Sequence, residues 1–226
     1  IKVAAAARPM GINSRILTQG SCFADAIGDR LAAHKMNVLT NPFGVIYNPA
    51  SIHKVLSYSI FNEPLPEHTY LHHHDVHLNF NFHSEFSAMT KEDLASRLTN
   101  TIGSTHYFLK DADWLVLTYD TAWIYQRKET GEVVANCHKL PSGMFSKSLM
   151  GLDAITASFK DLFYQLKKFN ANIKVILTVS PVRHLRDTLE MNSVSKSALR
   201  VACDQLSASF DDVEYFPAFE MMIDDL

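Results

Sequence analysis

Residues 15–34 read RILTQGSCFADAIGDRLAAH, and this stretch decides the fold. Its first five residues suit a β-strand that ends at Gly20. After the turn, Phe23, Ile27 and Leu31 recur at helical spacing, with alanines between them that favour a helix. The stretch therefore predicts a strand, a tight turn and a helix, which is the repeating unit of a parallel α/β fold.

The same alternation of strands and helices continues along the chain. Further strands are predicted at residues 36–40, 114–118, 173–179 and 213–216, and helices at 51–60, 91–107, 151–169 and 195–209. Ser51 is the expected N-cap of the second helix. Residues 122–125 and 133–135 indicate an inserted hairpin, and residues 61–89 a loop excursion or small hairpin near the mouth of the domain. Five strands separated by helices predict a single domain over residues 1–226, a three-layer α/β/α sandwich with a mainly parallel, flavodoxin-like five-stranded sheet.

The composition limits the classes of partner. Lysine and arginine number 21 against 24 aspartates and glutamates, and neither sign is gathered into a block, so no nucleic-acid partner is expected. Three separated cysteines without a CxxC pair predict neither a disulfide framework nor a zinc ribbon, and they fit a reducing, cytoplasmic location. No apolar run is long enough for a membrane span. The chain begins at Ile1, so a removed signal sequence stays open.

Polar segments follow four of the predicted strands. They are Gly20-Ser21, Asn41 to Gly44, Tyr119 to Trp123, and Ser180 to His184. Parallel sheets place their sites beyond the carboxyl ends of the strands. We therefore expect one edge of the sheet to collect these segments.

Ser21 stands where the first strand turns into the first helix. The main-chain amides of Ser21 and Cys22 would lie at the positive end of the helix dipole, where they can hold a developing oxyanion. The alternative is that Ser21 only caps the helix. Cys22 is either a rival nucleophile, because a helix N-terminus lowers the pKa of a thiol, or a small buried apolar residue.

Several short motifs, in order along nearly the whole chain, resemble the GSCFA domain family. They are Gly20 to Ala24, Asn41 to Gly44 with Tyr47 to Pro49, Phe82 to Ser84, Asn136 to Lys139, Ser180 to His184, and Asn192 to Lys196. Members of that family are grouped with the SGNH, or GDSL-like, hydrolases. The resemblance implies an SGNH-like fold and a serine ester hydrolase or acyltransferase that needs no cofactor or metal. Its expected substrate is a small-molecule or carbohydrate acyl ester, by analogy with the superfamily.

The resemblance also implies roles for individual residues. Ser21 takes the place of the nucleophilic serine, and Gly44, after the second strand, takes the place of the oxyanion glycine. The third SGNH block, a glycine followed by an asparagine, is replaced here by Tyr119-Asp120-Thr121-Ala122. Asn136 is the nearest alternative amide donor, provided that the predicted hairpin folds it back towards Ser21.

The general base is the missing part of this pattern. The superfamily keeps it in a late Asp-x-x-His motif, and the chain reaches Leu226 without one, so we expect truncation just short of the catalytic histidine. Within the chain, His184 is the best substitute, because a serine needs a base within hydrogen-bond reach. His138 has a weaker claim. For each, the alternative is a structural histidine.

Two further side chains are expected to bind substrate. Arg183 suits a carboxylate or phosphate through its planar fork, and the alternative is a surface salt bridge. His83 belongs to one of the family-like motifs and could reach over the site as a lid or substrate contact.

Two other functions stay open. A catalytically silent binding or interaction domain is favoured by Asp120 and by the missing Asp-x-x-His motif. A metal-dependent hydrolase would use the histidines of residues 72–77 and His83, although consecutive residues cannot all face one ion, which favours a solvated rim loop. The sequence sets neither the oligomeric state nor the choice between hydrolysis and transfer.

Overall fold

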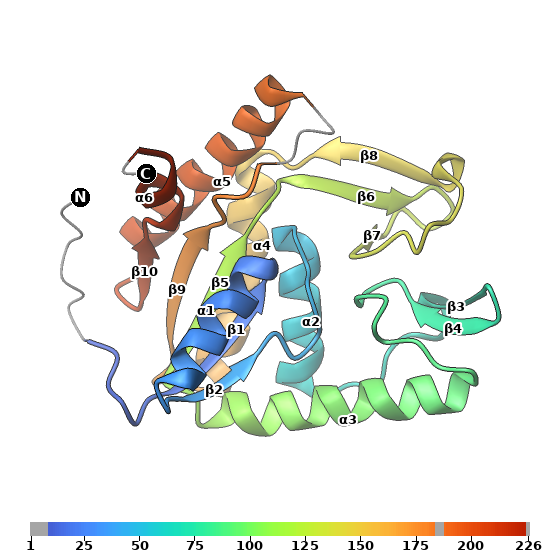
Figure 1. Ribbon diagram of the computed structural model, residues 1–226, viewed down its shortest axis with the longest axis horizontal. Coiled ribbons are helices and arrows are strands. Elements are labelled where there is room, and N and C mark those ends of the chain that lie inside the picture. Colours follow the sequence, from blue (N-terminus) through green and yellow to red (C-terminus); the bar gives the residue numbers. More distant parts are fainter. Residues whose placement is uncertain (1–8, 184–187, 225–226) are drawn as a thin grey trace.

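A five-stranded sheet forms the centre of the computed structural model, which describes residues 9–183 and 188–224 (Figure 1). Its strands are β1 (Arg15–Gly20), β2 (Asn37–Thr40), β5 (Trp114–Tyr119), β9 (Lys174–Val179) and β10 (Val213–Phe216). They lie in the order β10-β9-β5-β1-β2 and every pairing is parallel. This is the flavodoxin-like order, in which the direction of winding reverses between β1 and β5. The predicted fold class is confirmed, with a sheet that is wholly parallel.

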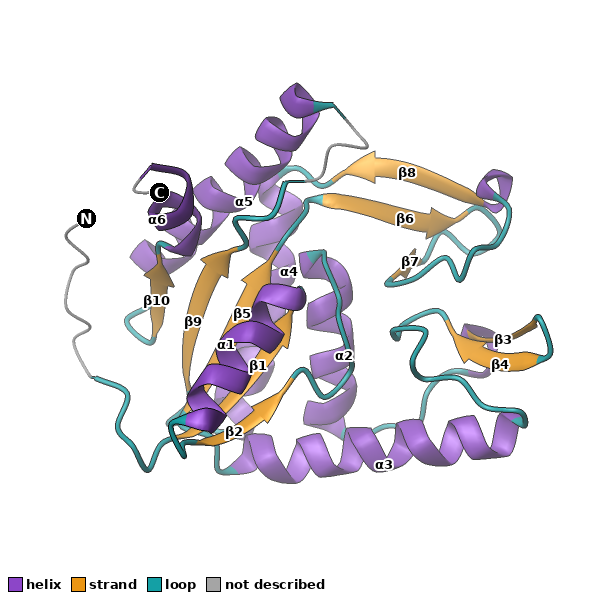
Figure 2. Cartoon of the chain, viewed as in Figure 1, coloured by secondary structure: helices purple, strands orange, loops and turns teal. Residues whose placement is uncertain are grey.

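Helices cover both faces of this sheet (Figures 1 and 2). They are α1 (Cys22–Ala33), α2 (Pro49–Phe61), α3 (Lys91–Lys110), α4 (Leu152–Phe169), α5 (Leu189–Ser209) and α6 (Ala218–Asp224). Side chains alternate across each strand, so Ile16 packs with Leu31 of α1 on one face, while Leu17 joins the larger core with α2, α4 and α5 on the other. In the described part of the chain, no helix is long and apolar enough to cross a membrane.

Two helix starts differ from the prediction. Helix α2 is capped by Asn48 rather than Ser51: the Asn48 side chain accepts the Ser51 amide at 2.9 Å, and Pro49 occupies the first turn. Helix α5 begins at Leu189 rather than at residue 195, because the hydroxyl of Thr188 accepts the amide of Met191. The apolar periodicity used for the prediction does not report such caps. Helix α6 was not predicted.

The residues inserted between these elements form two small antiparallel sheets beside the main one (Figure 2). The predicted hairpin is a three-stranded sheet of β6 (Trp123–Arg127), β7 (Val133–Val134) and β8 (Phe145–Leu149), in which β8 was not predicted. The excursion at residues 61–89 contains a hairpin of β3 (Tyr70–His73) and β4 (Val76–Asn79). Single 3-10 turns occur at Glu67–Thr69 and Ser142–Met144.

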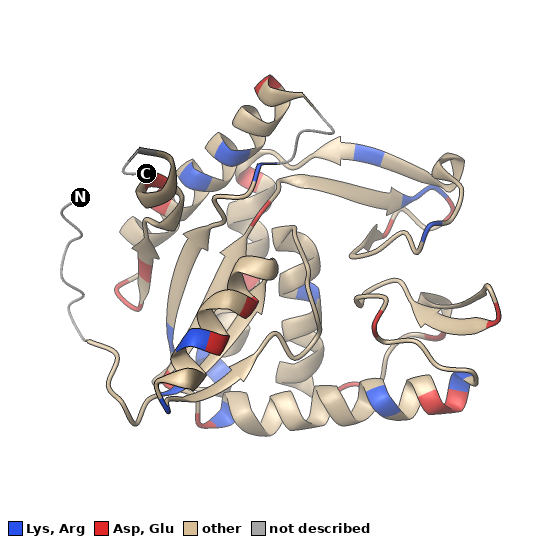
Figure 3. Ribbon diagram, viewed as in Figure 1, with Lys and Arg blue, Asp and Glu red and all other residues tan. Residues whose placement is uncertain are grey.

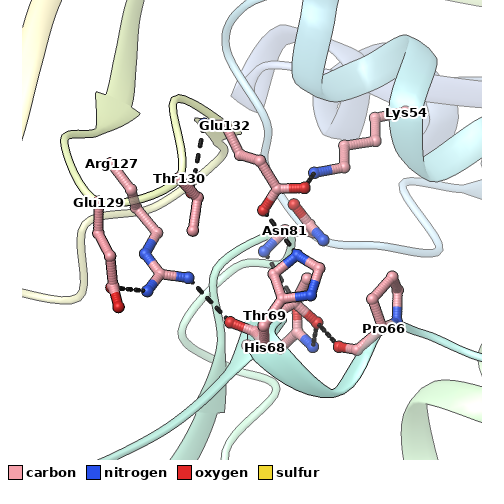
Figure 4. A network of polar contacts seen from close by, with 10 residues as sticks. Lys54, Pro66, His68, Thr69, Asn81, Arg127, Glu129, Thr130 and Glu132 are labelled. Carbon is pink, nitrogen blue, oxygen red and sulfur yellow. Dashed lines mark hydrogen bonds and ion pairs between the residues drawn. The ribbon is translucent and has the colours of Figure 1, made fainter.

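A network of polar contacts fastens these two small sheets together (Figure 4). The carboxylate of Glu132 accepts a hydrogen bond from His68 Nε2 at 2.8 Å and lies 4.0 Å from the ammonium group of Lys54 on α2. Arg127 donates to the carbonyl of His68 at 2.8 Å, and its guanidinium group lies over the Phe80 ring. Cation–π contact and hydrogen bonds thus join β6, the β3–β4 segment and α2.

Candidate active site

The turn at Gly20 brings β1 and β5 into direct backbone contact. Gly20 has φ +152°, and a Cβ atom there would lie 2.2 Å from the carbonyl oxygen of Thr118. The next amide, that of Ser21, donates to the same oxygen at 3.2 Å. Only glycine fits this close approach of the two backbones. The contact lies between β1 and β5, where the winding of the sheet reverses, and open α/β sheets bind ligands at such a position.

We expect Gly20→Ala to lower the free energy of unfolding by about 1–3 kcal/mol, because the added methyl group meets backbone that cannot move without disturbing the β1–β5 ladder. Urea denaturation followed by circular dichroism measures the change. Gly143→Ala is the matched control, since a Cβ there meets nothing within 4 Å. Equal stability of the two variants would contradict the close approach.

Ser21 lies at the carboxyl end of β1 and is the N-cap of α1. Its side-chain oxygen accepts the amide of Phe23 at 3.3 Å, and the residue is fully buried. In this structure Ser21 therefore acts as the N-cap of α1. The Ser21 amide donates to Thr118, and the amides of Phe23 and Ala24 both donate to Ser21. Among the described residues, the Cys22 N–H is therefore the donor left at this helix end.

Cys22 is exposed beside Ser21, so the interpretation of this thiol as a buried apolar residue is wrong. Burial raises the pKa of Tyr47, and negative charge on Cys22 and Asp120 raises it further. The Tyr47 carbonyl accepts the amides of Asp120 and Thr121 at 3.0 and 3.2 Å. The loop after β2 and the loop after β5 thus meet next to the Ser21 turn.

Asn41, at the end of β2, connects the same loops. Its side-chain oxygen accepts the Gly20 amide at 2.8 Å, and its NH2 group donates to Asp25 at 2.6 Å. Gly44 follows with φ +70°, and a Cβ there would lie 2.7 Å from the Cβ of His83. The Gly44 amide donates to the main-chain carbonyl of Asn41 at 2.8 Å. Gly44 therefore lies at the carboxyl edge of the sheet, but its N–H is already used within a turn.

A groove of about 910 Å³ begins at Tyr47 and Thr121 and runs along the β6–β8 sheet. Two of the predicted binding residues, His83 and Asn136, line it. The side-chain oxygen of Asn136 accepts the amide of His138 at 2.8 Å. Asn136 thus lies beside the same groove as Tyr47. Ser21, towards which Asn136 was predicted to fold back, is not among the described residues that line this groove, so the role of Asn136 as an amide donor stays a prediction.

His138 is buried and points to the β3–β4 hairpin. Its Nε2 lies 2.8 Å from the carbonyl oxygen of Asn79, so Nε2 carries a proton and donates, and burial lowers the pKa of the imidazole. These contacts are those of a structural histidine, which was the alternative to a catalytic role for His138.

Arg183 is not among the described residues that line this groove. Arg183 lines a separate cavity of about 400 Å³ with residues of α5 and α6, among them Arg200 and Phe219. His184 lies outside the described residues, and its role stays a prediction.

The histidines of the β3–β4 hairpin do not form a ligand set. His72 and His77 face each other across the two strands, with ring centroids 4.7 Å apart. Among residues 9–183 and 188–224, no group of three histidine, cysteine, aspartate or glutamate side chains is placed to hold a metal ion.

A buried ion pair at the carboxyl ends of β5 and β9 was not predicted. The ammonium group of Lys196 on α5 donates to the carboxylate of Asp120 at 2.8 Å, to the Asp120 carbonyl at 2.6 Å and to the Ser180 carbonyl at 2.8 Å. Both side chains are almost fully buried. Asp120 stood out in the sequence as a departure from the SGNH pattern, and Lys196 closes one of the family-like motifs, but their spacing of 76 residues gives no sign that they pair.

The residue before Lys196 extends this connection to the groove. Ser195 Oγ accepts the amide of Ala122 at 2.8 Å and lies 3.2 Å from Thr121 Oγ1. Thr121 Oγ1 in turn accepts the amide of Trp123 at 3.1 Å. Helix α5 therefore holds the turn from β5 into β6, which forms one end of the groove.

Comparison with known proteins gives one structure, one family and no curated relative. The structure is an acetyl xylan esterase from the rumen bacterium Butyrivibrio proteoclasticus, 13% identical, with a TM-score of 0.26 over 47% of this chain and 28% of that chain. That likeness is too distant to support an argument. No curated protein matches significantly. The model of the GSCFA family matches residues 15–226, from the first residue of β1 onward, and the chain therefore belongs to the GSCFA family.

Proposed function

We propose that this chain is a serine ester hydrolase or acyltransferase of SGNH type, in which Ser21 attacks an acyl ester. The position of Ser21 carries the proposal: it ends β1, caps α1 and lies where the winding of the sheet reverses. Negative charge that develops on a carbonyl oxygen is stabilised at a helix N-terminus. The GSCFA family match supports the proposal at the level of a hydrolase.

In this mechanism the Ser21 hydroxyl leaves its capping position before it attacks. The hydrogen bond from Phe23 N to Ser21 Oγ is 3.3 Å long, beyond the usual range for N–H···O, so little free energy is needed to break it. The Oγ atom then bonds to the acyl carbon, the carbonyl electron pair moves onto the oxygen, and the serine proton passes to a histidine, with His184 as the candidate. When this intermediate collapses, the bond to the alcohol oxygen breaks and the histidine returns the proton to the departing alcohol, which leaves an acyl-enzyme for water or a second alcohol to attack. The Cys22 amide holds the oxyanion, assisted by the Asn136 side chain or by Gly44 after the turn at Asn41 opens.

A serine-directed phosphonate probe tests the nucleophile. We expect the probe to label the protein, Ser21→Ala to abolish the labelling, and Cys22→Ala to keep it, because the latter removes the thiol and retains the main-chain N–H. The labelled peptide is identified by mass spectrometry. Labelling that persists in Ser21→Ala would refute the assignment, and labelling lost only in Cys22→Ala would move it to the thiol.

A silent binding domain is the second candidate, and two observations favour it. Ser21 is fully buried in its cap, and Asp120, paired with Lys196, stands where the SGNH pattern has a glycine. Short p-nitrophenyl acyl esters distinguish the two functions: turnover that depends on Ser21 supports the enzyme, and neither turnover nor labelling supports the binding domain.

A further inference from the structure

The groove beside the β6–β8 sheet presents aromatic side chains to solvent. Trp123 and Tyr125 are two residues apart on β6, so they project from the same face of this sheet, and both line the groove. Tyr125 is 39% exposed. Its cross-strand partner on β8 is Lys147, whose ammonium group lies 4.6 Å from the centre of the Trp123 ring and 5.6 Å from that of Tyr125. Strand pairing and cation–π contact thus hold both rings in place before any ligand arrives.

Several polar side chains of the groove can donate hydrogen bonds to a ligand. Asn136 uses its oxygen on the His138 amide, which leaves its NH2 group for a ligand. Lys139 adds a further cationic donor, and no aspartate or glutamate of the described chain lines the groove.

We propose that this groove binds the alcohol part of the ester substrate, an oligosaccharide chain that carries O-acyl groups, with Trp123 and Tyr125 as stacking residues. The choice of an O-acylated substrate rests on the proposed function. Binding of the oligosaccharide in the groove can be measured without catalysis. The C–H face of a sugar ring packs on an aromatic ring, and an esterified hydroxyl carries a carbonyl oxygen that can accept from the Asn136 NH2 group or from Lys139. A groove of about 910 Å³ has room for more than a single short acyl ester.

Two other ligand classes fit the groove less well. A single-stranded nucleic acid also stacks on aromatic rings, but it needs a continuous basic channel. This groove is lined by Lys139 and Lys147 and by no arginine of the described chain, and the basic residues are scattered over many elements (Figure 3). A fatty acyl chain needs an apolar enclosure, whereas this groove mixes aromatic rings with lysine, asparagine and serine side chains.

Intrinsic fluorescence tests the proposal, because only one of the two tryptophans lies in the groove. Trp114 is buried in the core, so a change on titration reports Trp123. In the Ser21→Ala background, we expect partially O-acetylated gluco-, manno- or xylo-oligosaccharides to give a saturable change. The same oligosaccharides after alkaline deacetylation should bind about tenfold more weakly, which corresponds to the loss of one or two hydrogen bonds.

Substitutions in the groove separate stacking from a structural effect. We expect Tyr125→Ala to raise Kd about tenfold by fluorescence, and Trp123→Ala to do the same by isothermal titration calorimetry. Tyr107→Ala, which removes a 70% exposed ring from α3, should leave Kd unchanged. A panel in which no oligosaccharide saturates, or an unchanged Kd in both groove variants, overturns the proposal. If the oligosaccharides bind but the phosphonate probe does not label the protein, the groove proposal is supported and the assignment of Ser21 as nucleophile is refuted.

Discussion

Replacing Lys196 with methionine should lower the free energy of unfolding by about 3–5 kcal/mol, because the substitution removes the ammonium group that lies 2.8 Å from the buried Asp120 carboxylate. The methionine fills much of the same volume, so the loss reports the charge rather than a cavity. Urea denaturation monitored by circular dichroism gives the change. Lys160→Met, which removes an exposed lysine from α4, should stay within about 0.5 kcal/mol of the parent.

A second variant tests whether the loss of the Asp120–Lys196 ion pair is the cause. Adding Asp120→Leu to Lys196→Met should restore part of the lost stability, since a pair of buried charges replaced by apolar side chains is often neutral. If the double variant is as unstable as the sum of the two single variants, the two side chains are not coupled. A loss below about 1 kcal/mol in Lys196→Met would show that the lysine is not buried against Asp120.

The same variant bears on the proposed function. Lys196 ties Asp120 to Ser180, and the neighbouring Ser195 holds the turn that leads to Trp123. We therefore expect Lys196→Met to weaken oligosaccharide binding in the groove at a temperature where the variant is still folded. In the proposed enzyme, Lys196 acts as a positioning residue for the groove.

The fold was predictable from the sequence because its signals are local. The 3.6-residue period of Phe23, Ile27 and Leu31 and the apolar runs of β5 and β9 each specify an element without reference to the rest of the chain. The carboxyl-edge rule then places Gly20, Asn41 and Tyr119 together. Elements whose boundaries depend on caps, such as α2 with Asn48 and α5 with Thr188, were predicted less well, since a single side chain sets them.

The candidate site was predictable only in part because it depends on contacts between distant residues. Asn136 reaches the groove because the hairpin folds back on itself, whereas the prediction concerned an approach to Ser21. The sequence could not show that His138 would be bonded to Asn79, or that Arg183 would line a different cavity. The Asp120–Lys196 pair joins two elements by a long-range ion pair, for which neither periodicity nor a short motif gives a signal.

His53 predicts how the stability of this protein depends on pH. The imidazole is buried between α2, α4 and β5, with Nδ1 2.7 Å from Ser158 Oγ and Nε2 2.7 Å from the hydroxyl of Tyr119. Burial lowers the pKa of His53 to about 3. Neutral imidazole satisfies both hydrogen bonds, whereas the charged form would have to be desolvated without a counter-ion.

Acid should therefore destabilise the folded state. The unfolded chain takes up a proton on His53 near the ordinary pKa of 6.5, and the folded protein does so only near 3, so the free energy of unfolding falls as the pH drops through this interval. From about pH 7 to about pH 4 the expected loss is about 3 kcal/mol. Burial lowers the pKa of His138 as well, which adds a loss of the same sign.

Variants of two histidines test this dependence by urea denaturation across the same pH range. His53→Gln should be less stable near neutral pH, because it loses the fit between Ser158 and Tyr119, and its stability should fall less steeply as the pH decreases. His34→Gln, at the exposed end of α1, should keep the slope of the parent. If the slope of His53→Gln equals that of the parent, then folding does not lower the pKa of His53, and the imidazole is not buried in solution between Ser158 and Tyr119.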